Sequence, residues 1–111
     1  IDAPEMKQTC KNRKGKELLC GQLAKQALEK LVRGQGVTCK GDVRDRYKRF
    51  IGVCYVGPFN INEQMVADGW ALAYRKYSKD YMRAETFAKS RGEGIWGMEF
   101  VPPWDWRRQQ K

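Results

Sequence analysis

The group best suited to phosphate chemistry is DRYKR at positions 45–49, in which three cations surround Tyr47. Cations beside an aromatic ring suit a phosphate with a base or a sugar stacked next to it. The apolar runs on either side predict that this group forms the charged turn of a β-hairpin over residues 37–56. Charged turns are also common as solvated surface, so the group alone leaves both interpretations open.

A second group, IDAPE at positions 1–5, carries two carboxylates, those of Asp2 and Glu5. Pro4 favours extended backbone at Ala3, so both carboxylates are expected on an irregular segment rather than on a helix. Two carboxylates this close on an ordered turn can share a hard cation or a water molecule. Chain ends are often frayed, so this group also has a plain alternative without function.

The sequence contains no histidine. This excludes imidazole metal sites, histidine general bases and the Ser-His and Cys-His nucleophile systems. Any acid–base chemistry must therefore use carboxylates, lysine, tyrosine or metal-bound water.

Length and charge narrow the class of partner. The 111 residues suit one domain with a modest core, and 22 Lys and Arg against 13 Asp and Glu give a net charge of +9. A charge of this size attracts polyanions, so nucleic acid or an acidic polysaccharide is the expected partner. A basic domain whose charge serves solubility alone is the other interpretation.

The four cysteines have no CxxC spacing, and without histidine a zinc site would need all four in an unusual pattern. We expect two disulfides instead, Cys10–Cys20 across a polar loop and Cys39–Cys54 between facing arms of the hairpin. Disulfides indicate an oxidising compartment, so a secreted or periplasmic protein is expected. No apolar run reaches the length of a membrane span. The sequence opens abruptly, as it would after removal of a signal peptide.

Apolar periodicity and capping residues predict three helices around the hairpin. They are expected over residues 21–33, from Asn60 or Asn62 to Asp68, and from Ser78 to Gly92. The last of them is expected to turn four side chains towards the core, those of Tyr81, Ala84, Phe87 and Ala88.

Two aromatic stretches remain. Residues 70–77, WALAYRKY, fit either core aromatics with solvated charges or a wall on which a base stacks. The Trp-rich residues 95–106 are expected to wrap onto the body and to leave a basic end at 107–111.

Three of these segments together resemble the staphylococcal nuclease-like (thermonuclease) family. They are IDAPE, DRYKR, and the stretch from NEQMVADGWALAYRKYS through GIWGMEF, and they occur in the family's order at similar spacing over nearly all of the chain. The resemblance implies an α+β fold, an OB-type five-stranded barrel capped by three helices. It also implies a Ca²⁺-dependent endonuclease that hydrolyses phosphodiester bonds in DNA and RNA.

The resemblance also implies roles for individual residues. Asp2 matches the calcium-binding aspartate, the backbone carbonyl of Ala3 faces the ion, and Glu5 matches the general base. Arg49 matches the arginine that stabilises the transition state, since a guanidinium contacts two phosphate oxygens at once. The expected substrate contacts are Tyr47, Arg46, Tyr77 and Arg75.

The sequence departs from the family pattern at two places. Lys48 stands where the family has glycine, and a left-handed backbone there costs about 1–3 kcal/mol of strain that can redirect Arg49. Family members also carry three strands before the first motif, with a second calcium-binding aspartate and a second catalytic arginine. We therefore expect a single N-terminally truncated domain over residues 1–111, missing the N-terminal strands of the barrel.

Two consequences follow from that truncation. The chain alone is expected to be weakly active or inactive, with weak calcium binding at most. Exposed sheet edges are expected to favour a homodimer, by edge pairing or strand exchange. The alternative function is a non-catalytic protein on the same scaffold that binds nucleic acid or an acidic polysaccharide.

Overall fold

The computed structural model describes residues 1–44, 50–74 and 79–110, and these residues combine helices with two small sheets. In chain order the elements are β1 (Cys10–Lys11), β2 (Glu17–Leu18), α1 (Cys20–Val32), β3 (Thr38–Arg44), β4 (Phe50–Val56), β5 (Phe59–Asn60), α2 (Ile61–Ala67), α3 (Met82–Arg91), the 3₁₀ helix η1 (Gly94–Gly97) and α4 (Pro103–Gln109). The mixture confirms the α+β class. The five-stranded barrel and its missing strands stay a prediction.

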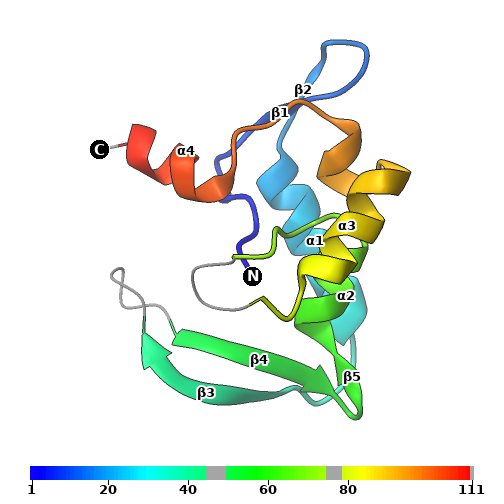
Figure 1. Ribbon diagram of the computed structural model, residues 1–111, viewed down its shortest axis with the longest axis vertical. Coiled ribbons are helices and arrows are strands. Elements are labelled where there is room, and N and C mark those ends of the chain that lie inside the picture. Colours follow the sequence, from blue (N-terminus) through cyan, green and yellow to red (C-terminus); the bar gives the residue numbers. More distant parts are fainter. Residues whose placement is uncertain (45–49, 75–78, 111) are drawn as a thin grey trace.

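The helices divide into a group of three and a single outlier. Helices α1, α2 and α3 pack together on one side of the sheet formed by β3, β4 and β5, and α4 stands apart from them across the N-terminal segment (Figure 1). No helix in the described ranges is long and apolar enough to cross a membrane.

The predicted hairpin is confirmed. Strands β3 and β4 pair antiparallel, with Cys39 directly opposite Cys54 and a change of register between Lys40 and Val43. Such an irregularity bends one strand and increases its twist. The charged turn that joins the strands, residues 45–49, lies outside the described residues.

The first two predicted helices are confirmed within one or two residues at each end. Helix α1 matches the stretch predicted over 21–33, and α2 begins after Asn60, whose side chain accepts a hydrogen bond from the backbone N–H of Glu63 (3.0 Å). This N-cap contact satisfies one of the N–H groups that a helix start leaves without a partner.

The third helix differs from its prediction. Helix α3 begins at Met82, later than Ser78, and the side chain of Phe87 is 53% exposed rather than in the core. The buried face of this segment holds Tyr81, Glu85 and Ala88 instead. Because these positions recur at four- and three-residue spacing, they define one face of the helix, and Phe87 falls to the side of it.

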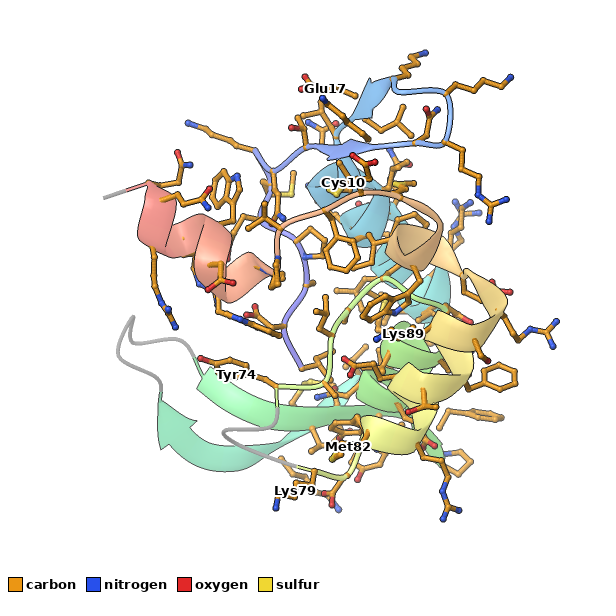
Figure 2. The ribbon with its side chains drawn as sticks, turned by 45° about the horizontal axis from the view of Figure 1, so that its top comes forward. Cys10, Glu17, Tyr74, Lys79, Met82 and Lys89 are labelled. Atoms are coloured by element: carbon orange, nitrogen blue, oxygen red, sulfur yellow. A yellow bond between two sulfur atoms is a disulfide. The ribbon has the colours of Figure 1, made fainter. Side chains whose placement is uncertain are left out.

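Both predicted disulfides are present, Cys10–Cys20 and Cys39–Cys54. The first lies where β1 approaches the start of α1 (Figure 2), and both of its cysteines are buried. The second joins the two strands of the hairpin, where Cys39 is exposed.

Two apolar clusters hold the elements together. One joins the sheet to α2 and α3, and its buried members are Val56, Ile61, Met65, Val66, Ala71, Ala73 and Tyr81. The other joins the Cys10–Cys20 bridge to Leu72 and Ile95, with Trp96, Phe100 and Trp104 of the aromatic tail packed against it. The prediction that the tail wraps onto the body is thereby confirmed, although its helix α4 was not expected.

The two disulfides are expected to contribute unequally to stability. Replacing Cys10 and Cys20 together by Ala should lower the free energy of unfolding by about 4 kcal/mol or more, because it removes a crosslink and leaves a cavity in the core. Replacing Cys39 and Cys54 together by Ala opens a slightly longer loop, 15 residues against 10, but less buried volume is lost, and it should cost about 3 kcal/mol. Urea unfolding compares the two variants, and an equal or larger loss for the hairpin pair would contradict this assignment.

Candidate active site

The N-terminal segment is fixed by backbone pairing. Asp2 donates its N–H to the carbonyl of Leu72 (2.9 Å), and Leu72 donates its N–H to the carbonyl of Asp2 (2.8 Å). Ala3 packs against the cluster that joins the sheet to α2 and α3. The start of the described chain is therefore an ordered strand-like segment rather than a frayed end.

The partner of this segment is itself held by α3. The backbone N–H of Ala73 donates to Oε2 of Glu85 at 2.7 Å, in a buried setting. A buried carboxylate needs such a donor, since its desolvation is otherwise costly. Glu85 therefore fixes residues 71–73, and these in turn fix Asp2.

The turn that carries Glu5 is built on Gln8, whose side chain is almost fully buried. The backbone N–H of Gln8 donates to the carbonyl of Glu5 (2.8 Å), and the N–H of Glu5 donates to Oε1 of Gln8 (3.2 Å). The amide nitrogen of the same side chain donates to the carbonyl of Val101 (2.6 Å). Gln8 therefore joins the turn at Glu5 to the segment that leads into α4.

Helix α1 approaches the same turn from the other side. A Cβ atom at Gly21 would lie 1.7 Å from the carbonyl oxygen of Glu5 and 3.0 Å from Cα of Met6. Only glycine leaves room for this contact between a helix and a neighbouring backbone. Gly21 thereby allows the first turn of α1 to support the backbone of Glu5.

Helix α4 is docked through its first turn. Pro103 occupies the first helical position, where proline is favoured, and is buried. The ring of Trp104 stacks in a tilted arrangement on Tyr74, with 5.2 Å between ring centroids. Residues three apart lie on one face of a helix, so this contact turns Arg107 towards the same side.

Arg107 joins the two carboxylates of the first motif. Its Nη1 donates to Oδ1 of Asp2 (3.0 Å) and to Oε1 of Glu5 (2.6 Å), and its Nη2 donates to Oδ2 of Asp2 (2.5 Å). The side chains of Arg107 and Asp2 are 12% and 7% exposed, and that of Glu5 is 32% exposed. A charge-assisted pair with two parallel hydrogen bonds is among the strongest polar contacts in proteins, and burial protects it from screening.

The electrostatics of this cluster are dominated by its own charges. Burial alone would lower the pKa of the Arg107 guanidinium, but the hydrogen bonds to Asp2 and Glu5, together with their negative charges, raise that pKa above its ordinary value. Arg107 is therefore a permanent cation between the two carboxylates.

The structure brings together Asp2 and Glu5, with Ala3 between them, but their individual roles stay a prediction. The other expected site residues lie outside the described residues, namely Arg46, Tyr47, Arg49, Arg75 and Tyr77, and so does Lys48. Arg107 was expected only as the first residue of a basic end, and its contacts with Asp2 and Glu5 were not predicted. The sequence PPWDWR does indicate part of this arrangement. Two prolines favour the start of a helix, and Trp104 precedes Arg107 by three residues, so both side chains are expected on one face of it.

In this arrangement, Arg107 is hydrogen-bonded to the carboxylate oxygens of Asp2 and Glu5 that a calcium ion could use. Ca²⁺ takes six to eight oxygen ligands, whereas the described part of the chain contains no group of three or more Asp, Glu, Cys or His side chains that could hold a metal ion. Both carboxylate oxygens of Asp2 accept hydrogen bonds from Arg107. The donor chemistry of Asp2 and Glu5 suits a hard cation, but a guanidinium already bridges them.

Comparison with known proteins decides the family. A family model described as "Staphylococcal nuclease homologue" matches residues 1–98, which contain Asp2, Glu5 and both disulfides. The chain belongs to the staphylococcal nuclease family. Within this family of nucleases, the match ends before α4, so Arg107 lies beyond the matched part.

Of three individual relatives, two are named as nucleases. The chain is 38% identical to a protein named "Uncharacterized endonuclease" from Haemophilus influenzae, over the whole chain and 58% of the relative. It is 33% identical to "Probable staphylococcal-like nuclease CAN3" from Oryza sativa subsp. japonica, over the whole chain and 28% of the relative. It is 34% identical to "Succinoglycan biosynthesis protein ExoI" from Rhizobium meliloti, over 86% of the chain and 52% of the relative. The chain thus spans little more than half, or less, of these relatives.

Gly21→Ala should destabilise the protein although alanine is the better helix former. In an open helix the change would add about 1 kcal/mol of stability, but here the new methyl group meets the carbonyl of Glu5. We expect the free energy of unfolding to fall by about 3 kcal/mol, within the range for overpacking. Urea unfolding of the variant and the wild type measures this change in the free energy of unfolding.

Gly36→Ala provides the matched control, because nothing lies within 4 Å of its added Cβ. Its free energy of unfolding should stay within about 0.5 kcal/mol of the wild-type value. A neutral or stabilising Gly21→Ala would show that α1 does not support the Glu5 turn.

Proposed function

We propose that this chain forms most of the nuclease domain of a protein that hydrolyses phosphodiester bonds in DNA or RNA. One observation carries the proposal: the two carboxylates of the family's first motif, Asp2 and Glu5, lie within the part matched by the nuclease family and are brought together at one charged centre. The net charge of +9 supports a polyanionic substrate.

The proposed reaction uses a water molecule as nucleophile. Glu5, whose side chain is partly exposed, takes a proton from the water as its oxygen bonds to phosphorus. The bond from phosphorus to the leaving oxygen breaks, and that oxygen takes a proton from solvent. Arg49 is proposed to donate to the non-bridging oxygens, where negative charge accumulates. Arg46, Tyr47, Arg75 and Tyr77 are the proposed contacts to the rest of the nucleic acid.

Calcium is the proposed cofactor, with Asp2 and the backbone carbonyl of Ala3 as its ligands in this chain. Membership of the nuclease family supports this assignment. Because Arg107 bridges the acidic residues in the described arrangement, no step of the reaction above is assigned to the ion. With so few ligands, calcium binding by residues 1–111 is expected to be weak.

We also propose a secreted or periplasmic location and self-association. The two disulfides support an oxidising compartment. A homodimer through sheet edges or strand exchange is supported by the exposed residues of β3 and by Phe59 of β5, which is 73% exposed. Light scattering at high concentration is the direct measurement, and a clean monomer would contradict the dimer.

A second candidate is a non-catalytic protein that binds nucleic acid or an acidic polysaccharide. Two observations favour it: one relative is named for succinoglycan biosynthesis, and the chain is strongly basic. Such a protein would bind DNA with a steep dependence on salt, because each neutralised phosphate releases counterions.

Cleavage of supercoiled plasmid tests the nuclease. We expect residues 1–111, extended by the sequence encoded upstream of Ile1, to cut the plasmid in Ca²⁺ but not in EDTA, and Glu5→Gln to slow cutting by about 100-fold or more. Residues 1–111 alone should cut weakly or not at all.

The control for Glu5 is Glu29→Gln, on the exposed part of α1, which should leave the cutting rate unchanged. Salt-dependent binding without cleavage by the extended chain would favour the second candidate. Strong calcium-dependent cutting by residues 1–111 would show that the expected weakness of the short chain is wrong.

A further inference from the structure

The guanidinium of Arg107 stands between the groups that a metal ion would have to bridge. It donates to both oxygens of Asp2 and to Oε1 of Glu5, over distances of 2.5 to 3.0 Å. A cation with oxygen ligands at 2.3 to 2.6 Å, as Ca²⁺ requires, would have to approach the same buried oxygens that Arg107 already contacts. Arg107 and a metal ion therefore compete for Asp2 in this arrangement.

Charge favours the same conclusion. Asp2 and Glu5 supply two negative charges in a partly desolvated setting, and Arg107 balances one of them. A divalent ion placed beside the guanidinium would be repelled by it at short range, where the low local dielectric strengthens the repulsion. Releasing Arg107 removes that repulsion and frees the Asp2 oxygens in one step.

Arg107 is also held in place by contacts of its own helix and of the segment just before that helix. Trp104 of the same helix packs on Tyr74, and Gln8 joins Val101, just before α4, to the turn at Glu5. These contacts keep the guanidinium close to the carboxylates, so its effective concentration there is high. A metal ion must therefore compete with the guanidinium of Arg107, which is held close to both carboxylates.

We propose that Arg107 is a positioning residue that competes with the divalent cation for Asp2 and Glu5. In the metal-free protein it holds both carboxylates in place, and metal binding requires it to release Asp2. The inference rests on the proposed metal site at Asp2. It concerns a residue beyond the part of the chain matched by the family.

The inference is tested by comparing the calcium affinity of the wild type with that of Arg107→Ala, which lacks the guanidinium charge. Tb³⁺ luminescence, sensitised by the nearby Trp104 and titrated back with Ca²⁺, is measured on residues 1–111. Arg107→Ala should bind Ca²⁺ about tenfold more tightly than the wild type, as expected for a typical coupling between competing sites. It should also melt several degrees lower without metal, because Asp2 loses its partner, and Ca²⁺ should narrow that difference.

Arg108→Ala is the matched control. It removes the same charge from the same helix, but Arg108 is exposed and pairs only loosely with Asp105, at 3.6 Å. Its calcium affinity should stay within about twofold of the wild-type value, which separates competition at Asp2 from a general change in charge. Arg107→Gln, which keeps a hydrogen-bond donor, should bind as tightly as Arg107→Ala and serves if the alanine variant does not fold.

The outcomes separate this inference from the proposed function. Tighter binding by the Arg107 variants and not by Arg108→Ala supports competition, since a merely structural role would weaken metal binding. Equal or weaker binding by the Arg107 variants overturns the competition and leaves the metal site standing. If neither the wild type nor the variants bind Ca²⁺ or Tb³⁺, both the competition and the calcium site at Asp2 are overturned.

Discussion

A guanidinium held between two carboxylates is the contact on which the site depends. Burying Asp2 would be strongly unfavourable without a partner, because a desolvated charge must be paired and hydrogen-bonded. Arg107 provides that partner from a helix near the other end of the chain. The placement of the N-terminal segment and the docking of α4 are therefore parts of one interaction.

The remaining supports of the site come from three directions and act mainly on backbone groups. Helix α3 fixes the segment beside Asp2 through Glu85, helix α1 approaches the turn at Glu5 through Gly21, and Gln8 connects that turn to the tail. Backbone contacts of this kind position the Cα atoms of Asp2 and Glu5, while the ion pair with Arg107 orients their carboxylate groups. Such division of labour suits a site whose groups must be held within a fraction of an ångström.

The sequence alone was sufficient wherever local chemistry decided the structure. Facing cysteines set the register of the hairpin, and Asn60 capped α2 as its spacing indicated. It failed where a distant contact decided. Phe87 fits an apolar stripe, yet the buried face of α3 is chosen by the contact of Glu85 with Ala73. Arg107 looked like one of several terminal cations, because PPWDWR indicates a helix and its orientation but does not show that the partner of Arg107 is Asp2.

The contact between Asp2 and Arg107 spans 105 positions, almost the full length of the chain. The entropy lost in closing a loop grows with its length, so this contact is expected to form after the hairpin and the helices have brought the ends together. During synthesis, Asp2 emerges 105 residues before Arg107, and Glu5 emerges 102 residues before it. A growing chain therefore carries the acidic half of the site well before the cation that completes it.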